Sequence, residues 1–548
     1  MNQKITYSFV GGSNNTVYPS IEGAAISRNM FTEANTDGKK DVRTFMQSAP
    51  GIKIISSLGS TDKCDGMFVP STGLASNDFI PSLFVAYRGQ IVRVDSAWNT
   101  EVIGSYALGN TVNFAESGGE RAVLLWVDGQ SINGYDLKTG ASVDITLPQR
   151  VNEETFIKPT HIAVVSGSIV LNDAGSSYTY YSYRYPLNNN TREIFDLDNG
   201  VVQYEDDGIT VKKKTVNSGE YAFYDDYGVQ LFFNASTSSD KCIAISSVGP
   251  LLTLFGPSSI EFYQRGDAES YQTWQNTSYT INKEQGLEAR YSLASVNHQQ
   301  FCIGTGKANA KCVLLINGTN VSKISPLWLD KILNSSDVKH VIGWTYSKNN
   351  HSFYLFSIED NCYCYDVTTN EWHIRSSRNF YNGRNKNYMP LYAAWFNNKI
   401  ITGCCENGNL FELDENYYYE DFDMTCRNEV LDKDKHRLPL LRTRQTPVIT
   451  TNYAPFIIFE LALECNTGSL EEYGKTAVAL LSVSNDGGYT FNNVIEASAG
   501  QKGQYFTRLK WLNLGMQRQC VLRVSYSEPS DFVISDSTIR FTELATGV

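Results

Sequence analysis

The chain has 548 residues, with 46 lysines and arginines against 58 aspartates and glutamates, and its formal net charge is −12. This acidic balance excludes proteins that hold nucleic acid by bulk attraction to its phosphates. Hydrophobic residues make up 42% of the chain and aromatic residues 12%, and long runs rich in Ala, Glu, Lys, Leu and Arg are absent. The composition therefore favours strands over helices, and we expect only one short helix, Leu327–Ile332.

The cysteines and the N-terminus indicate where the protein is found. Eleven cysteines, an odd number, are scattered without the dense even spacing of small disulfide-stapled domains, so we expect free thiols in a reducing compartment. The N-terminal residues lack the apolar stretch of a secretion signal, and no apolar run is long enough to cross a bilayer. We expect a soluble protein that is not exported by the ordinary route.

The segment Ser352–Ser377 shows most clearly a pattern that other segments share. Apolar and polar residues alternate up to Ile358, Glu359-Asp360-Asn361 makes a turn, and alternation resumes from Cys362. A second turn leads to a third strand at Glu371–Ile374. Because a hairpin alone is marginally stable in water, several such units must pack together.

Similar hairpins recur along the chain, at Leu83–Asp95, Val123–Leu137, Leu251–Gln264, Val313–Ile324 and Lys399–Leu413. Asp128-Gly129, Asn317-Gly318 and Asn407-Gly408 supply turn dipeptides that favour positive φ. Except across one long gap, the hairpins start at intervals close to the ~40–50 residue period of propeller blades. The sequence thus predicts an all-β protein containing a β-propeller of about six blades. A large irregular β-sandwich with chance hairpins is the alternative.

The predicted domain boundaries lie where the regular spacing of the hairpins stops. Ile162–Leu171 reads as an ordinary strand pair, but a polar, Tyr-rich insert follows it, and six alternating segments follow Leu440. We expect the first segment to enter the first blade or to complete the last one, and the insert to be either a partner-binding rim loop or a solvated decoration. The predicted parts are an N-terminal extended arm (1–60), a first propeller part (61–183), an inserted small β subdomain on the rim (184–228), a second propeller part (229–425) and a C-terminal β-sandwich-like domain (426–548).

The sharpest short motif is an Asp box with the pattern Ser-x-Asp-x-Gly-x-Thr-Phe. Its aspartate can cap backbone N–H groups of a turn, and its glycines can adopt positive φ. Its phenylalanine can pack beneath the hairpin. Asp boxes recur in sialidases away from the catalytic centre, so we interpret this single copy as structural. The residues are Ser484, Asp486, Gly488, Thr490 and Phe491.

Other residues that often carry chemistry do not form a recognisable site. Cys362 and Cys364, with His373 nearby, and the adjacent Cys404 and Cys405 lack the paired spacing of a zinc site, and we expect buried small residues instead. The six histidines are dispersed, and no nucleotide-binding or nucleophile motif is present. We predict no catalytic residue, no cofactor and no metal.

Several phrases resemble the packaged-DNA stabilisation proteins of short-tailed bacteriophages, which are also described as tail-hub or nozzle proteins. The resemblance runs in matching order from about residue 20 to the C-terminus, with the segment 184–228 looking like an addition. The most specific phrase is Phe-Gly-x-Ser-x-Ile-Glu, within Leu254–Tyr263. The other phrases are Asn29-Met-Phe with Ala49–Ile52, Ile281–Gly286 and Tyr365–Trp372.

This resemblance implies a structural virion protein and not an enzyme. Family members form a homohexameric ring below the portal and its adaptor, extend the channel for genome ejection, help retain packaged DNA, and offer attachment points for tailspikes or fibres and for a plug or needle. Such a protein is assembled in the cytoplasm of the host bacterium and is found in the phage tail.

The charge of the chain agrees with this implied role. Six copies of a chain with charge −12 carry −72 formal charges, and a wall that repels double-stranded DNA lets it pass without tight binding. The candidates for acidic residues facing the channel are Glu205, Asp206, Asp207, Asp225, Asp226, Glu420, Asp421 and Asp423.

Two other functions stay open at this point. A sialidase-like glycoside hydrolase on a propeller would need a cluster of arginines and a Tyr/Glu nucleophile pair at the propeller axis. A carbohydrate- or receptor-binding tail component would need neither.

Overall fold

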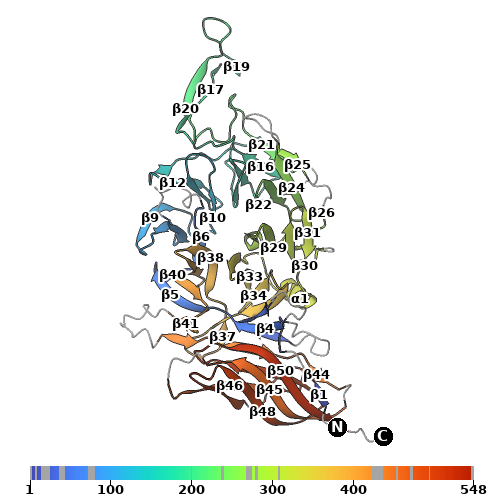
Figure 1. Ribbon diagram of the computed structural model, residues 1–548. Helices are drawn as coiled ribbons and strands as arrows, with labels where there is room; N and C mark the ends of the chain where they lie inside the picture. Colours follow the sequence, from blue (N-terminus) through green and yellow to red (C-terminus); the bar gives the residue numbers. More distant parts are fainter. Residues whose placement is uncertain are drawn as a thin grey trace.

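The computed structural model describes residues 3–5, 9–13, 25–35, 43–71, 81–198, 200–235, 240–266, 274–277, 282–306, 309–422, 436–451, 454–468, 473–492 and 494–544. These residues form three parts in a row, which are a small β insert, a β-propeller and a β-sandwich (Figure 1). The expected short helix is confirmed as α1 (Leu327–Ser335), three residues longer than predicted. No helix in these ranges has the length and apolarity needed to span a membrane.

The described residues contain seven propeller blades, arranged as a ring that Figure 1 shows face on. Each blade is an antiparallel sheet with its first strand nearest the axis. Blade 1 is β6 (Cys64–Phe68), β7 (Leu83–Tyr87), β8 (Gln90–Val94) and β9 (Thr100–Ser105), and blade 2 is β10 (Asn113–Glu116), β11 (Val123–Val127), β12 (Ile132–Asp136) and β13 (Ser142–Val143). Blade 3 is β14 (Ile162–Val165), β15 (Ser168–Asn172), β16 (Tyr178–Tyr181) and β21 (Phe232–Asn234), and blade 4 is β22 (Ala244–Val248), β23 (Leu251–Phe255), β24 (Ser259–Arg265) and β25 (Trp274–Asn276), with β26 (Asn282–Lys283) beside β24.

The remaining three blades complete the ring. Blade 5 is β27 (Gly286–Leu287), β28 (Ala294–Val296), β29 (Gln299–Thr305), β30 (Lys311–Asn317) and β31 (Asn320–Lys323). Blade 6 is β32 (Gly343–Lys348), β33 (His351–Ile358), β34 (Asn361–Asp366) and β35 (Glu371–Arg375). Blade 7 is β38 (Pro390–Phe396), β39 (Lys399–Cys404), β40 (Asn409–Asp414) and β5 (Gly51–Ser57), extended by β41 (Tyr419–Asp421) and β42 (Arg437–Pro439).

The predicted hairpins are pairs of adjacent strands in blades 1, 2, 4, 5, 6 and 7. They are the two central strands of each blade except blade 5, where the hairpin is formed by β30 and the outer strand β31. Blade 3 is the additional one, because the insert separates its third strand from its fourth and so hides the blade period. Gly129 and Gly318 have the expected positive φ of 86° and 60°. The expectation is wrong for Gly408, where a Cβ would lie 2.7 Å from the backbone of Gly59; this glycine is required by close approach.

Packing between the blades explains why several strands are apolar throughout. Every residue of β7 and of β11 is buried, because each blade is covered on both faces by its neighbours. The apolar side chains between blades 1 and 2 form one cluster that contains Phe84, Leu124 and Trp126.

The ring is closed by a strand from the other end of the chain. β5 pairs antiparallel with β40, so the N-terminal segment supplies the outer strand of the last blade. This is one of the two placements that the sequence analysis allows, and it removes the free edge that the last blade would otherwise expose.

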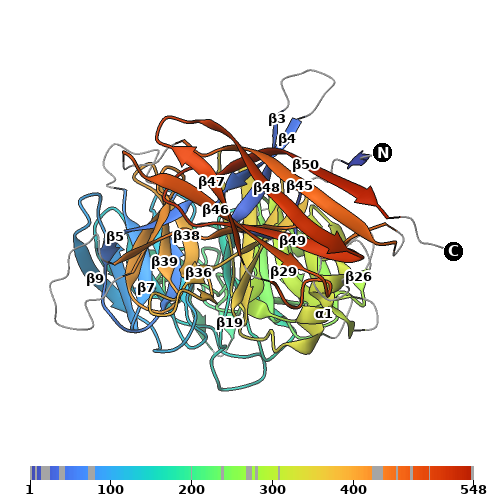
Figure 2. The ribbon, with the colours of Figure 1, turned by 90° about the horizontal axis from the view of Figure 1, so that it is seen from below.

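The C-terminal part is a sandwich of two sheets that also includes N-terminal strands. One sheet has the order β3 (Met30–Asn35), β4 (Arg43–Ser48), β50 (Val533–Glu543), β45 (Phe456–Asn466), β48 (Phe506–Gln517), with β1 (Gln3–Ile5) beside β50. The other has β2 (Ile26–Arg28), β43 (Arg442–Gln445), β49 (Gln519–Tyr526), β46 (Thr476–Ser484) and β47 (Ile495–Gln501), with β44 (Ile449–Thr450) beside β49. The sandwich core contains the fully buried Trp511, and Figure 2 shows this domain lying across the propeller.

The sandwich and the propeller share one sheet. β2 pairs parallel with β35 of blade 6 and antiparallel with β43 of the sandwich, which makes a continuous ten-stranded sheet. The insert is attached differently. Its two ribbons, β17 (Thr191–Phe195) with β20 (Lys213–Asn217) and β18 (Leu197–Asp198) with β19 (Val201–Val202), extend from the rim at the end of the molecule away from the sandwich (Figure 1).

Candidate functional site

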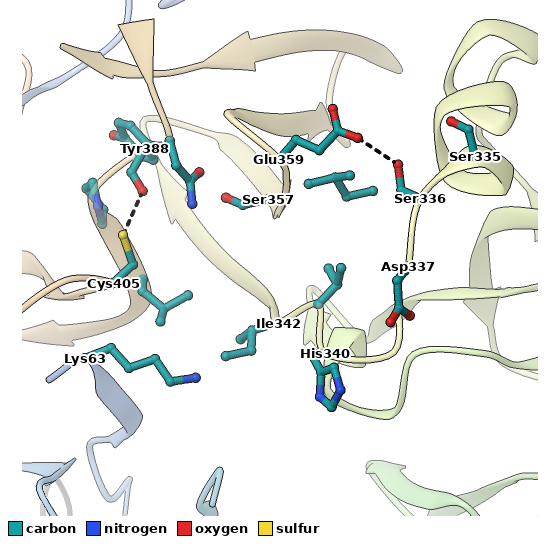
Figure 3. A pocket seen from close by; sticks show the side chains of 15 residues that line it. Lys63, Ser335, Ser336, Asp337, His340, Ile342, Ser357, Glu359, Tyr388 and Cys405 are labelled. Carbon is teal, nitrogen blue, oxygen red and sulfur yellow. Dashed lines mark hydrogen bonds between the residues drawn. The ribbon is translucent and has the colours of Figure 1, made fainter. Parts of the chain in front are cut away.

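A pocket of about 480 Å³ lies at the end of the propeller where the inner strands of blades 6, 7 and 1 begin. Figure 3 shows that its side chains come from several blades and from the loop after α1. The lining mixes apolar and polar side chains and carries both signs of charge, with Lys63 on one side and Asp337, beside His340, across from it. Two of its polar groups are engaged, because Ser336 Oγ donates to Glu359 (3.3 Å) and the Cys405 thiol to the Tyr388 carbonyl (3.6 Å).

This pocket does not have the groups that a sialidase-like site requires. No arginine is among the described residues that line it. Tyr388 does line it, but burial raises the pKa of its hydroxyl well above the ordinary value, so this tyrosine is a poor nucleophile.

The cysteines noted in the sequence lie in the core. Cys362, Cys364 and Cys404 belong to the apolar cluster between blades 6 and 7. Burial raises the pKa of Cys362 to about 12, so its thiol stays protonated and is a weak metal ligand. All ten cysteines in the described ranges are free, and those ranges contain no group of three or more His, Cys, Asp or Glu side chains placed to hold a metal ion.

The Asp-box residues form a compact turn between β46 and β47. Asp486 accepts hydrogen bonds from Ser484 Oγ (2.7 Å), from the backbone N–H groups of Tyr489 (3.0 Å) and Thr490 (2.9 Å), and from the Thr490 hydroxyl. These bonds hold the pKa of the Asp486 carboxyl well below its usual value. Gly488 has a φ of 98°, and the Arg523 guanidinium lies 3.5 Å from the centre of the Phe491 ring. All of these contacts are local to the sandwich.

The predicted acidic residues of the insert serve mainly its own turns. Glu205, Asp206 and Asp207 are exposed, and Asp207 accepts hydrogen bonds from the backbone N–H groups of Ile209 and Thr210, which lower its pKa. Asp225 caps a second turn, and Asp226 forms an ion pair with Arg192.

The second predicted acidic segment is different. Glu420 has 0% exposed surface and accepts a hydrogen bond from the Arg378 backbone N–H (3.0 Å). Burial raises its pKa to about 8, so it is protonated at neutral pH, and the prediction that it presents a charge to a channel is wrong. Asp421 is half-buried and accepts from the Ile54 N–H (3.0 Å), which ties β41 to β5. Asp423 lies outside the described residues.

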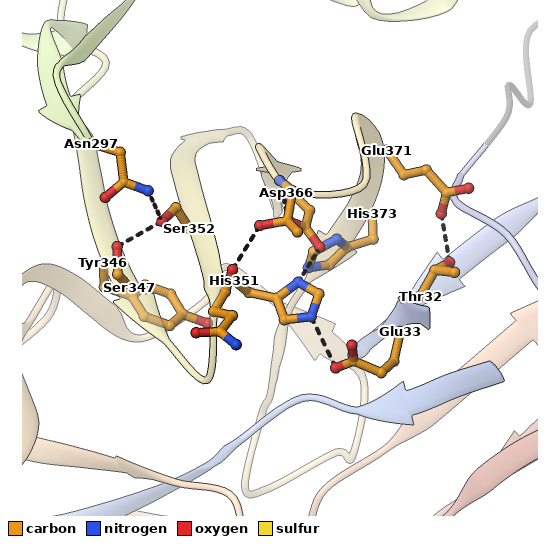
Figure 4. Close-up of polar contacts among 12 residues, drawn as sticks. Thr32, Glu33, Asn297, Tyr346, Ser347, His351, Ser352, Asp366, Glu371 and His373 are labelled. Atoms are coloured by element: carbon orange, nitrogen blue, oxygen red, sulfur yellow. Dashed lines mark hydrogen bonds and ion pairs between the residues drawn. The ribbon is translucent and has the colours of Figure 1, made fainter. Parts of the chain in front are cut away.

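The most developed polar cluster lies at the joint between propeller and sandwich, and sequence reasoning missed it. His351 Nδ1 is 2.7 Å from the Asp366 carboxylate of blade 6, and His351 Nε2 is 2.9 Å from the Glu33 carboxylate of β3 (Figure 4). Desolvation lowers the pKa of His351, but its bonds to Asp366 and Glu33 outweigh that effect and raise it. The only sequence signal was a histidine at a strand start, which is too common to be informative.

Asn29 completes this joint. It has a φ of 53° and is 1% exposed, and its Nδ2 donates to the carbonyls of Ser376 (2.9 Å) and Leu441 (2.9 Å). Its Oδ1 accepts from the Ser376 N–H (3.0 Å). One side chain thus links the N-terminal arm, the end of blade 6 and the start of the sandwich strand β43.

Several solved structures show a distant likeness to this chain. The computationally designed Ika8 protein is 10% identical with a TM-score of 0.32, and the match covers 66% of this chain and 100% of that one. A catalytically inactive virginiamycin B lyase from Staphylococcus aureus is 9% identical with a TM-score of 0.36, covering 66% and 98%. The extracellular domain of BT4673 from B. thetaiotaomicron is 9% identical with a TM-score of 0.36, covering 66% and 39%. At these sequence identities and TM-scores, the three structures give no basis for inferring what this chain does.

Comparisons of the sequence are more informative. A search of curated proteins finds no match. Two family models do match, and they do so in chain order: the β-propeller of Bacteriophage P22 Gp10 over residues 224–418 and its β-sandwich over residues 442–542. Together they span more than half of the chain. The first covers blades 4 to 7 of the propeller, and the second covers the C-terminal strands of the sandwich, from β43 to β50. The chain therefore belongs to the Bacteriophage P22 Gp10 family of podovirus tail-hub or nozzle proteins, and it is a structural protein of a phage tail.

Proposed function

We propose that the chain forms the nozzle of the tail, as a ring of six copies below the portal and its adaptor. The match of both domains to the Bacteriophage P22 Gp10 models is the observation that carries this proposal. In this role the protein extends the exit channel, retains packaged DNA and performs no catalysis.

The joint between the two large domains supports this mechanical role. A channel wall next to packaged DNA must keep its shape under load. The shared ten-stranded sheet and the buried side chains of Asn29 and His351 tie the sandwich to blade 6 by backbone and side-chain hydrogen bonds. A loosely tethered second domain would lack this resistance, because relative motion is the default for domains with small interfaces.

The charge of the protein supports passage of DNA without tight binding. The chain has a net charge of −12, and binding to DNA gains affinity chiefly from cations that displace counterions. Of the acidic residues considered for the channel surface, Glu205 and Asp206 are exposed and have no capping role among the described contacts. We propose these two as the first candidates.

The elongated shape offers two separate ends for partners. The insert and the sandwich lie at opposite ends of the propeller (Figure 1). We propose that these ends carry the contacts with the adaptor ring, with tailspikes or fibres and with a plug or needle, in a virion assembled in the host cytoplasm.

Mixing the purified chain with its adaptor ring tests the assembly. Native mass spectrometry is expected to show six copies on one adaptor ring, even if the chain alone is a monomer. A chain that stays monomeric at all ratios contradicts the proposal.

A charge-reversed variant, Glu205→Lys with Asp206→Lys, tests the acidic surface. It is expected to slow DNA ejection from assembled particles, because new cations hold the polyanion. Glu154→Lys, at an exposed position between blades 2 and 3, serves as the control. If particles with the parent chain, the double variant and the control eject DNA at the same rate, Glu205 and Asp206 do not face the channel.

A further inference from the structure

A buried arginine without a partner lies where the insert leaves the propeller. Arg265 ends β24 in blade 4 and is 5% exposed. Its Nε, Nη1 and Nη2 atoms are all buried, and none has a hydrogen-bond partner among the described residues. A buried guanidinium without an acceptor is costly, since a charge removed from water needs a compensating group.

A second buried donor lies on the neighbouring strand. Trp274 begins β25 and is directly opposite Arg265 in the antiparallel register. Its indole Nε1 is likewise buried without a partner among the described residues. Two unsatisfied donors from adjacent strands therefore occupy one place in blade 4.

The charged surroundings of Arg265 contain a further cation. Burial is the main cause that lowers the pKa of Arg265 to about 10. The positive charge of Arg184 acts in the same direction, and Tyr181 and Tyr185 act in the opposite one. Glu261 is the acidic residue two alternations before Arg265 on β24. Its carboxylate already accepts hydrogen bonds from the Tyr263 hydroxyl (2.7 Å) and from Asn276 Nδ2 (3.3 Å). No described carboxylate pairs with Arg265.

Aromatic rings form the walls around these donors. The Trp274 ring stacks on Phe233 with centroids 5.5 Å apart and meets Tyr181 edge-on at 6.0 Å. Tyr181 ends β16, the last strand before the insert, so the place lies between blades 3 and 4 beside the base of the insert (Figure 1).

We propose that Arg265 and Trp274 form a binding site for an oxyanion, of which a carboxylate is the best fit. The planar fork of a guanidinium matches the two oxygens of a carboxylate in a bidentate pair, and the indole N–H adds a third donor. Arg184 draws the anion toward the site. The carboxylate comes either from a free small anion or from an acidic side chain of a neighbouring tail protein.

Thermal unfolding of the full chain tests the site. Sodium acetate, compared with sodium chloride at equal ionic strength, is expected to raise the unfolding midpoint by about 1–2 °C at concentrations near ten times its Kd. Arg265→Met is expected to lose this response, although its midpoint in chloride is unchanged or higher, because a buried unpaired charge has been removed. Arg265→Lys keeps the charge without the fork and is expected to respond more weakly than the parent chain.

Controls separate this site from general anion effects and identify the source of the carboxylate. Arg93→Met removes an arginine that already pairs with Glu101 (3.4 Å) and is expected to keep the full response. A response to the peptide acetyl-Gly-Asp-Gly-amide supports a site for protein side chains, whereas a response to acetate or phosphate alone supports a site for free anions. The proposal is overturned if the parent chain responds to none of these probes, or if Arg265→Met responds as strongly as the parent.

Discussion

The sandwich and the insert are both additions to the propeller, but they are held in opposite ways. The sandwich shares a sheet with blade 6, receives three strands from residues 26–48, and buries Asn29 and His351 at the joint. The insert consists of two short ribbons in which Val201 and Ile209 are exposed, the latter by 83%. The comparison teaches that the sandwich is built into the ring by shared strands. In the insert, by contrast, only the base reaches the propeller core, through Leu187, Ala222 and Phe223, and the ribbons lie beyond it.

The largest effect is expected from removing the arm that connects the sandwich to the ring. Deletion of residues 1–57 removes β5 from the last blade and β2, β3 and β4 from the sandwich. The product is expected to be insoluble or to lose cooperative unfolding by circular dichroism, because both domains then expose unpaired edges. A truncated chain that unfolds at the same temperature as the parent would show that the propeller and the sandwich do not need the arm.

Asn29→Ala tests the joint at one residue. It removes three hydrogen bonds and leaves buried backbone groups without partners, so unfolding is expected to cost about 3–5 kcal/mol less. Asn29→Gly loses the same bonds but tolerates the φ of 53°, and it is expected to be less destabilised than the alanine variant by about 1 kcal/mol. Chemical denaturation of the three proteins measures both differences. Parent-like stability of the alanine variant would show that the joint does not depend on this side chain.

His351→Gln tests the ionic part of the joint. Because the pKa of His351 is raised above 6.5 in the folded state, its contribution is fully present below pH 6.5 and is lost as pH rises through the raised value. The variant is expected to be less stable than the parent by about 1.5–3 kcal/mol below that pH, with a smaller difference in alkali. The charged groups facing His351 are Glu33 and Asp366, and the nearby His373 has a pKa lowered by burial and by Arg375.

Unfolding followed by tryptophan fluorescence from pH 5.5 to 9 measures this difference. His340→Gln, at an exposed histidine of the pocket shown in Figure 3, is the matched control and is expected to follow the parent at every pH. A gap between parent and His351→Gln that widens with rising pH would contradict the assigned sign.

The smallest effect is expected from deleting the ribbon of the insert. Thr191 and Asn217 are paired across β17 and β20, so a short Gly-Ser turn can replace the residues between them. The unfolding midpoint is expected to stay within about 1 °C of the parent, because loops and surface ribbons add little to global stability. Electron microscopy of tails assembled from this variant would then lose density only where the insert lies, which also locates its partner. A large drop in the midpoint would show that the insert belongs to the folding unit after all.

The sequence was sufficient for the parts of the fold that local pattern controls. Alternation and turn dipeptides identified the hairpins of six blades, and six C-terminal segments such as Phe456–Leu463 are strands of the sandwich. The strand pair Ile162–Leu171 of blade 3 was identified, but it was not counted as a blade because a period cannot be seen across an insert of this length. The membership of β2, β3 and β4 in the sandwich was also out of reach. Ile26 of β2 pairs with Gln445, Met46 of β4 pairs with Ile534, and β3 joins the sheet through β4, so no local signal records these contacts.

The site residues show the same limit. The turn chemistry of Asp486 follows from its neighbours within four residues, so its hydrogen bonds could be expected from the motif. Glu420 lies in an acidic, aromatic stretch that looks exposed, but tertiary packing buries it against Arg378. The unpaired Arg265 had no sequence signal, because the lack of an acceptor becomes visible only when every neighbouring element is in place.

The pairing of β5 with β40 has a consequence for how the protein is made. The ribosome releases β5 early, but its hydrogen-bonding partner emerges roughly 20–70 s later at synthesis rates of about 5–20 residues per second. Throughout that interval the nascent chain carries a β-strand with both edges available to other chains in the cytosol. Slower accumulation, through lower temperature or weaker induction, reduces the number of such chains present at once, and this should decide whether recombinant protein is recovered folded or as inclusion bodies.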